Sequence, residues 1–174
     1  MNSKSVKHTN LKNKIHSGKV RDIYEIDEDK LLFVATDRIS AFDVIMEQTV
    51  PGKGIVLNNL SSFWFDFFNN YNTHYISKAQ DFDFSNTDYD EIIDVEILKR
   101  STVVKKAERI DMECVVRGYI TGSAWNEYKS SNSVNFKPIM DNLLEAEKFK
   151  TPIFTPSTKA EEGHDEALSE KEGK

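Results

Sequence analysis

Arg117 is the residue whose type and position ordinary packing explains least. It interrupts an apolar run in CVVRGYITGSAW, residues 114–125, which predicts a strand followed by a Thr-Gly-Ser corner. A guanidinium on such a strand destabilises the fold unless a carboxylate or a phosphate compensates it. A helix beginning near Gly122 and Ser123 would offer backbone N–H groups to the same anion. The spacing leaves two interpretations open: an anion site, and a structural ion pair with a glutamate.

A second candidate is the segment Gly18-Lys19-Val20-Arg21. Glycine lets the backbone approach a ligand closely, and on a strand the lysine and the arginine would point to one face. We predict a turn that covers phosphates, although its spacing is not that of a Walker loop. An ordinary hairpin with surface cations is the alternative.

Two further segments could bind small molecules. Residues 35–43, ATDRISAFD, place two carboxylates, an arginine and hydroxyl groups at the end of an apolar run. They could bind a polyhydroxylated or phosphorylated molecule, or form a turn whose polar groups satisfy one another. Residues 51–54, PGKG, suit either an anion or a plain turn.

The sequence predicts no metal site and no disulfide. The four histidines lack the spacing of metal ligands. Cys114 is the single cysteine, which excludes an internal disulfide, and we expect it to be a buried strand residue rather than a nucleophile. The histidines are His8, His16, His74 and His164.

Alternating and helical patterns predict the elements that position these residues. Apolar and aromatic residues recur every three or four positions over residues 57–71, which predicts a helix whose aromatic stripe packs into the core. The boundary of a β-rich first lobe is expected at residue 110, and a second section follows over residues 111–174. The other predictions are a hairpin over 19–26 and 31–35, strands over 42–46, 101–107 and 113–120, a helix over 124–129, an extended segment over 151–156 and a helix starting at Ser169.

Composition narrows the class of protein. The chain has 174 residues, of which 39% are hydrophobic and 30% charged, as in a globular protein. The net charge of −6 argues against binding nucleic acid through a basic surface. No apolar run approaches the ~20 residues that span a bilayer, and no secretory signal precedes the first lobe. We therefore expect a cytoplasmic protein that binds neither membranes nor nucleic acid.

Several segments, in order along the chain, resemble the SAICAR synthetase family, and its yeast-like branch in particular. They are GKVRDIYE (18–25), ATDRISAFD (35–43), PGKGIVLNNLSSFW (51–64), MECVVRGYITGSAW (112–125) and PIFTPSTKAEEGHDE (152–166). The resemblance implies an α+β fold with a β-rich nucleotide-binding lobe and the start of a second α+β lobe. It also implies a ligase of purine biosynthesis, which joins L-aspartate to the carboxylate of the aminoimidazole ribonucleotide CAIR at the expense of ATP.

The resemblance also implies roles for individual residues. Those implied for ATP are Gly18, Lys19, Val20, Arg21, Lys105, Lys106, Met112 and Glu113, with Lys19, Arg21 and Asp37 as catalytic residues. Those implied for the other substrates are Ser40, Asp43, Arg117, Ser123, Lys159 and His164.

The chain departs from the family pattern in two ways. Asp111 stands where a proline is usual, and the later Asp-x-Lys-x-Glu-Phe-Gly block is absent from the sequence. The ligands of the Mg²⁺ that accompanies ATP are therefore expected beyond residue 174, and weak or no ligase activity is expected of this chain alone. Two alternatives stay open: a non-catalytic module that associates with itself or a synthetase, and a site rebuilt for another nucleotide reaction.

Overall fold

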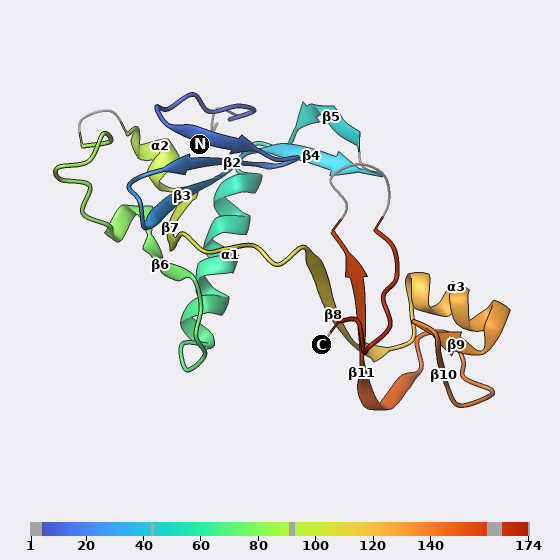
Figure 1. The fold of residues 1–174 in the computed structure, drawn as a ribbon. Helices are drawn as coiled ribbons and strands as arrows, with labels where there is room; N and C mark the ends of the chain where they lie inside the picture. The colour runs from blue at the N-terminus through green and yellow to red at the C-terminus, as the bar shows by residue number, and fades with distance from the viewer. Residues whose placement is uncertain (1–4, 43, 91–92, 160–164, 174) are drawn as a thin grey trace. The chain divides into compact units, whose positions relative to one another are not determined.

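The computed structural model describes residues 5–42, 44–90, 93–159 and 165–173 (Figure 1). The chain divides into two compact units, Met1–Glu108 and Arg109–Lys174. Each unit combines strands with helices, the mixture expected of an α+β fold. In the part of the chain that the structure describes, no helix is both long and apolar enough to cross a membrane.

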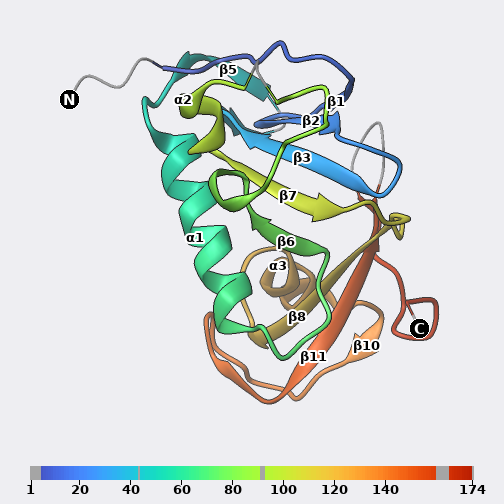
Figure 2. The ribbon, with the colours of Figure 1, turned by 90° about the vertical axis from the view of Figure 1, so that its left-hand side faces the viewer.

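A five-stranded antiparallel sheet forms the frame of the first unit, with strand order β1-β2-β3-β7-β6 (Figure 2). The predicted hairpin is confirmed, because β2 pairs with β3 from Arg21 opposite Ala35 to Glu25 opposite Leu31. A separate hairpin of β4 and β5 follows the sheet's third strand. The strands are β1 (Lys14–Ser17), β2 (Arg21–Glu25), β3 (Lys30–Ala35), β4 (Arg38–Ala41), β5 (Val44–Thr49), β6 (Tyr75–Lys78) and β7 (Ser101–Lys105).

The core of the first unit lies on one face of this sheet. Alternate residues of β2, Asp22 and Tyr24, are buried, as the period of two along a strand requires. A polypeptide segment that contains the 3₁₀ helix Ala79–Asp81 and the helix α2 (Val95–Leu98) supplies further core residues. The buried apolar cluster consists of Tyr24, Ile26, Leu32, Val34, Ala79, Phe84, Tyr89 and Val103.

Helix α1 (Lys53–Phe67) begins four residues before the predicted start at residue 57. Gly52 makes the entry turn in the left-handed region, with φ of 81°. Gly54 is already helical, and a Cβ on it would lie 2.2 Å from the carbonyl oxygen of Ala35. The glycine therefore permits the helix to approach β3 closely, which a turn motif read from sequence did not indicate.

The prediction that the aromatic stripe of α1 packs into the core is wrong. The apolar residues of the stripe keep between 39% (Leu57) and 65% (Tyr71) of their surface exposed. The residues of α1 that are buried are instead Gly54, Asn58 and Ser62. Small and polar side chains at this four-residue spacing let the helix lie close to the sheet, and the Asn58 amide donates to the Ser101 carbonyl at 3.2 Å.

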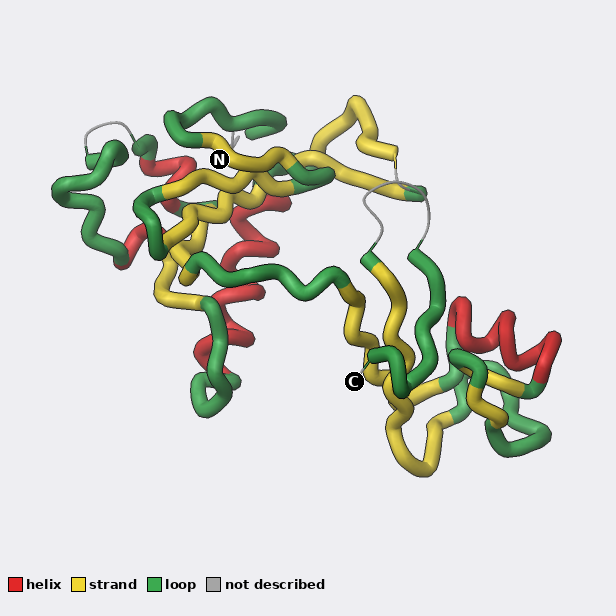
Figure 3. Tube along the Cα trace, viewed as in Figure 1, coloured by secondary structure: helices red, strands yellow, loops and turns green. Residues whose placement is uncertain are grey.

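The second unit is built on the antiparallel pair of β8 and β11 (Figure 3). The predicted strand, helix and extended segment are confirmed, whereas only a turn follows Ser169. Ile120, Ala124, Tyr128, Val134, Leu143 and Phe149 form its buried cluster. Its elements are β8 (Met112–Tyr119), α3 (Gly122–Ser131), β9 (Ser133–Val134), β10 (Lys137–Pro138) and β11 (Lys148–Thr158).

The burial of β8 is opposite to what we expected. Cys114 and Val116 lie on the exposed face of the strand, so the prediction of a buried cysteine is wrong. Val115 and Arg117 lie on the face that is partly buried. Within β8, the arginine rather than the cysteine is therefore directed to the partly buried face.

Candidate functional site

The turn Gly18–Arg21 is held in place by Arg38, the arginine of the ATDRISAFD segment that could have bound a small molecule. Arg38 is 1% exposed. Its Nε donates to the Lys19 carbonyl at 3.1 Å, and its Nη2 donates to the Gly18 carbonyl at 2.9 Å. The Nη1 group donates to the Lys7 carbonyl at 2.9 Å. One buried guanidinium therefore fixes the backbone of the predicted phosphate-covering turn.

Asp22 supplies the negative charge that this buried arginine requires. Its Oδ1 accepts from Arg38 Nη2 at 2.9 Å and from the Ser17 hydroxyl at 2.7 Å. Its Oδ2 accepts from both the backbone N–H and the hydroxyl group of Thr9. Burial by itself raises the pKa of Asp22, but these hydrogen bonds outweigh burial and hold the pKa well below its usual range.

Asp37, for which a catalytic role was implied, is buried and fully engaged. Its carboxylate accepts hydrogen bonds from the Val6 and Gly54 N–H groups and from Arg100 Nη1, at 2.8, 2.9 and 2.9 Å. Burial raises the pKa of Asp37, and the hydrogen bonds reverse that effect, so that the pKa is lowered. Through these contacts Asp37 connects the end of β3 to the start of α1. They do not support a catalytic role.

A cavity of about 220 Å³ lies in the first unit between the sheet and α1. Arg21 lines it, together with aromatic rings from β3 and α1 and polar side chains from α1 and β7. His74 is also part of its wall, and burial lowers the pKa of that imidazole. The remaining lining residues are Phe33, Ala35, Asn58, Ser61, Phe65, Thr102 and Val104.

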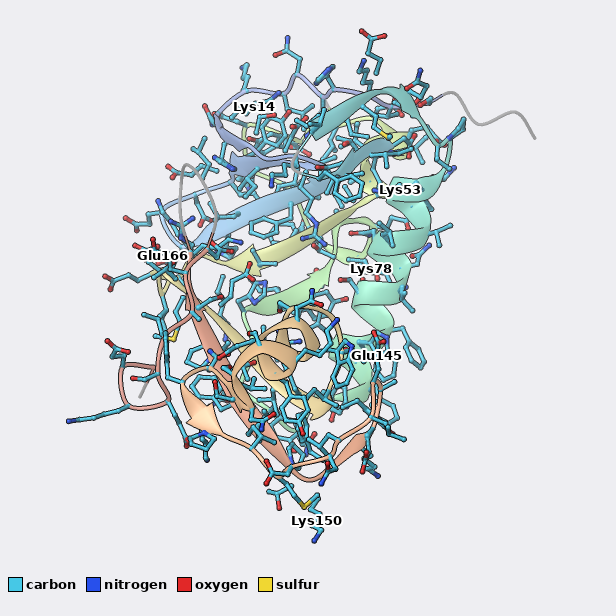
Figure 4. The ribbon with its side chains drawn as sticks, turned by 90° about the vertical axis from the view of Figure 1, so that its right-hand side faces the viewer. Lys14, Lys53, Lys78, Glu145, Lys150 and Glu166 are labelled. Atoms are coloured by element: carbon cyan, nitrogen blue, oxygen red, sulfur yellow. The ribbon has the colours of Figure 1, made fainter. Side chains whose placement is uncertain are left out.

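Lys53 adds a cation at the first residue of α1 (Figure 4). Burial lowers the pKa of its amine, the charge of Asp37 opposes that effect, and the charges of Arg21 and Arg38 lower the pKa further. The lysine of the PGKG segment thus belongs to the same positive region as Arg21. The segment contributes a cation to the first unit although it starts a helix instead of forming only a turn.

The other residues implied for the first unit are more dispersed. Lys106 forms an exposed ion pair with Glu25 at 2.7 Å. Lys105 lies opposite Lys30 in the register of β7 and β3. Ser40 is half-buried in β4, opposite Ile45. Asp43, implied for substrate binding, lies outside the described residues.

In the second unit, the structure brings Arg117 and Ser123 together. The Nη2 group of Arg117 donates to the Ser123 hydroxyl at 3.1 Å, and the Nε group donates to the Thr155 hydroxyl at 3.0 Å. Both partners are neutral. Within residues 5–42, 44–90, 93–159 and 165–173, Arg117 forms no ion pair.

The first turn of α3 begins beside this arginine. Thr121 is the N-cap residue, and its side chain makes no capping hydrogen bond. Gly122 has φ of 58°, in the left-handed region that favours glycine. Uncapped N–H groups at a helix start carry partial positive charge, so Arg117 and the start of α3 together form an electropositive corner.

Glu113 and Lys159, implied for different ligands, form an ion pair with each other. The hydrogen bond that the Lys159 amine donates to the Glu113 carboxylate raises the pKa of that amine. Met112 precedes this pair at the start of β8 and is half-buried. His164 lies outside the described residues.

The described residues do not form a magnesium site. No group of three or more His, Cys, Asp or Glu side chains in the described ranges could hold a metal ion. The buried carboxylates of Asp22 and Asp37 are already occupied by arginines and N–H groups. No step of the chemistry is therefore assigned to a metal held by these residues.

The family model described as SAICAR synthetase matches residues 14–173, which is nearly the whole chain. The chain belongs to the SAICAR synthetase family. A phosphoribosylaminoimidazole-succinocarboxamide synthase of Komagataella pastoris is 51% identical over 161 residues, which cover 89% of this chain and 53% of the relative. The chain spans about half the length of the curated SAICAR synthetases it matches.

Solved SAICAR synthetases share the fold. The SAICAR synthase of Saccharomyces cerevisiae, solved in complex with SAICAR, aligns with a TM-score of 0.80 and 45% identity over 95% of this chain and 56% of its own. A second SAICAR synthetase, solved in complex with ADP, aligns with a TM-score of 0.65 and 23% identity over 90% of this chain and 55% of its own. The predicted α+β SAICAR synthetase fold is thereby confirmed.

Proposed function

We propose that this chain binds the nucleotides of the SAICAR synthetase reaction, CAIR or SAICAR in its second unit and ATP in its first. In that reaction a carboxylate oxygen of CAIR attacks the γ-phosphorus of ATP, which gives an acyl phosphate and releases ADP. The amine of L-aspartate then attacks the acyl carbon and loses a proton, the C–N bond of SAICAR forms, and phosphate leaves.

The observation that carries the proposal is the electropositive corner formed by Arg117, Ser123 and the first turn of α3. Arg117 has hydroxyl partners where a structural arginine would have a carboxylate. A guanidinium beside a helix N-terminus suits a phosphate group, which accepts several hydrogen bonds and complements both charges. SAICAR carries such a group, and the related yeast synthase was solved in complex with SAICAR.

The site proposed for ATP is the sheet face that carries the cavity. Arg21 lines the cavity, and the Gly18–Arg21 turn adjoins it along β2. Lys19 and Arg21 would stabilise charge on the phosphoryl oxygens during transfer, which depends mainly on positioning and on cations. Lys53 adds to this positive region, and Lys105 and Lys106 of the same unit remain candidates for contacts with the nucleoside. A related synthetase was solved in complex with ADP, which supports a nucleoside diphosphate as a ligand.

Two broader statements belong to the same proposal. Self-association of the chain is supported by the exposed aromatic face of α1, since large apolar patches favour association. Light scattering at rising protein concentration tests it, and a constant monomer mass would exclude it. Residence in the cytoplasm, where purine nucleotides are made, stays a prediction.

Calorimetric titration of the chain with CAIR and with ATP tests the nucleotide proposal. Each nucleotide should bind at one site, and the free base of CAIR should bind far more weakly because it lacks the phosphate. A coupled assay of ADP release with CAIR, ATP and L-aspartate measures turnover separately. Absence of heat with both nucleotides would overturn the proposal.

A further inference from the structure

Thr155 is a buried hydroxyl residue on β11 to which no role has been assigned. It lies directly opposite Val115, whereas Ile153 lies opposite Arg117. The side chain of Arg117 therefore crosses diagonally to Thr155, two residues along the neighbouring strand, a distance that long side chains can span. Thr155 is only 4% exposed, so its hydroxyl group must find partners within the protein.

The hydrogen bonds of Thr155 have a defined direction. Its hydroxyl group donates to the Val115 carbonyl at 3.0 Å. The hydroxyl oxygen is then left to accept from the Nε–H of Arg117, also at 3.0 Å. Because Nε is the inner nitrogen of the guanidinium, this contact fixes the plane of the group and leaves the outer nitrogens for Ser123 and a ligand.

We propose that Thr155 is a positioning residue, which sets the guanidinium of Arg117 for recognition of the phosphate group of the substrate. The chain of contacts runs from the Val115 carbonyl through the Thr155 hydroxyl and Arg117 to Ser123. An arginine held at Nε has fewer rotamers to lose when it binds, so the affinity for a planar or tetrahedral oxyanion rises. This proposal rests on the function proposed above.

The test compares SAICAR with its dephosphorylated riboside in calorimetric titrations of the full chain. Thr155→Val keeps the shape of the side chain and removes the hydroxyl group. We expect SAICAR to bind about tenfold more weakly, the size of one lost charge-assisted hydrogen bond, while the affinity for the riboside stays unchanged. Thr155→Ser should restore the affinity for SAICAR, because it keeps the hydroxyl group.

Thr151→Val is the matched control, since Thr151 is exposed on the same strand. It should bind both compounds as the unmodified chain does. If the unmodified chain binds SAICAR no better than the riboside, the proposed phosphate site is wrong. If it prefers SAICAR and Thr155→Val prefers it equally, the phosphate site stands and the positioning role is wrong. A loss of affinity for both compounds, or no rescue by serine, would show that Thr155 serves only the fold.

Discussion

Replacement of Asp22 by asparagine tests how the turn Gly18–Arg21 is held in place. The Asp22→Asn substitution keeps the shape of the side chain and removes the charge that faces Arg38. Both partners are buried, and their nearest atoms are 2.9 Å apart. The new amide group would also direct N–H donors toward groups that are donors themselves, Arg38 on one side or Thr9 on the other.

The expected loss of unfolding free energy is about 3–5 kcal/mol, the range for removing one partner of a buried ion pair. That is a large part of the ~5–15 kcal/mol by which domains are usually stable. Asp27→Asn is the matched control, because Asp27 forms an exposed pair with Lys30 at 3.0 Å. Exposed pairs contribute about 0–1 kcal/mol, so the control should remain close to the parent.

Urea denaturation followed by tryptophan fluorescence provides the measurement. The two tryptophans lie in different units, so a Trp125→Phe background leaves Trp64 as the reporter of the first unit. The pKa of Asp22 is lowered in the folded state, so its charge stabilises the protein above the unfolded pKa of about 3.9. The difference between parent and Asp22→Asn should be constant near neutral pH and should narrow as the pH falls below about 4.

Two results would refute this reasoning. One is a loss below about 1 kcal/mol, equal to that of the exposed control pair. The other is a difference in stability that does not change between neutral and acidic pH. Either result would mean that the Asp22 carboxylate is not the partner that keeps Arg38, and with it the turn, in place.

Three further predictions follow from single contacts. Gly54→Ala should reduce the unfolding free energy by about 1–3 kcal/mol in the same urea assay, because its Cβ would collide with the Ala35 carbonyl; an unchanged midpoint would contradict the close approach of α1. Burial raises the pKa of Tyr89 to about 12, above its unfolded value of about 10, so the stability it contributes is lost as the pH rises through that range. Ultraviolet titrations of the folded parent and of the folded Tyr89→Phe variant should give the same tyrosinate absorbance up to about pH 11, because Tyr89 is still protonated there; extra tyrosinate absorbance in the parent near pH 10 would contradict it. Arg117→Lys should weaken SAICAR binding about tenfold in calorimetry, since an ammonium group lacks the fork of donors; equal affinity would show that charge alone is read.

Sequence patterns correctly predicted the elements that are determined by residues close to one another along the chain. The alternation in β2 and β3 follows from the period of two along a strand, and the hairpin is found where it was predicted. The corner at Ser123 was likewise visible, because glycine and serine after an apolar strand are typical of a helix start. These inferences need only a few consecutive residues, so the sequence carries them directly.

The features that sequence reasoning missed depend on contacts between distant segments. The packing face of α1 was misidentified because Gly54, Asn58 and Ser62 are not apolar, and their value lies in how closely the sheet approaches them. Arg38 was considered only as part of a possible ligand-binding segment, and its structural role was missed because its acceptors come from residues 7 and 18–22. Only the folded chain shows that one arginine serves both segments.

The most direct test of the central claim, that Arg117 and the start of α3 bind the phosphate of the substrate, is amide chemical-shift mapping by NMR. SAICAR is titrated into the isotope-labelled chain, and its dephosphorylated riboside serves as the control. The account predicts that the amide signals of Gly122, Ser123 and Ala124 shift and saturate with SAICAR and stay in place with the riboside. The account would be contradicted if SAICAR shifted other amide signals to saturation and left these three unmoved. Equal shifts of the three signals with the riboside would contradict it as well.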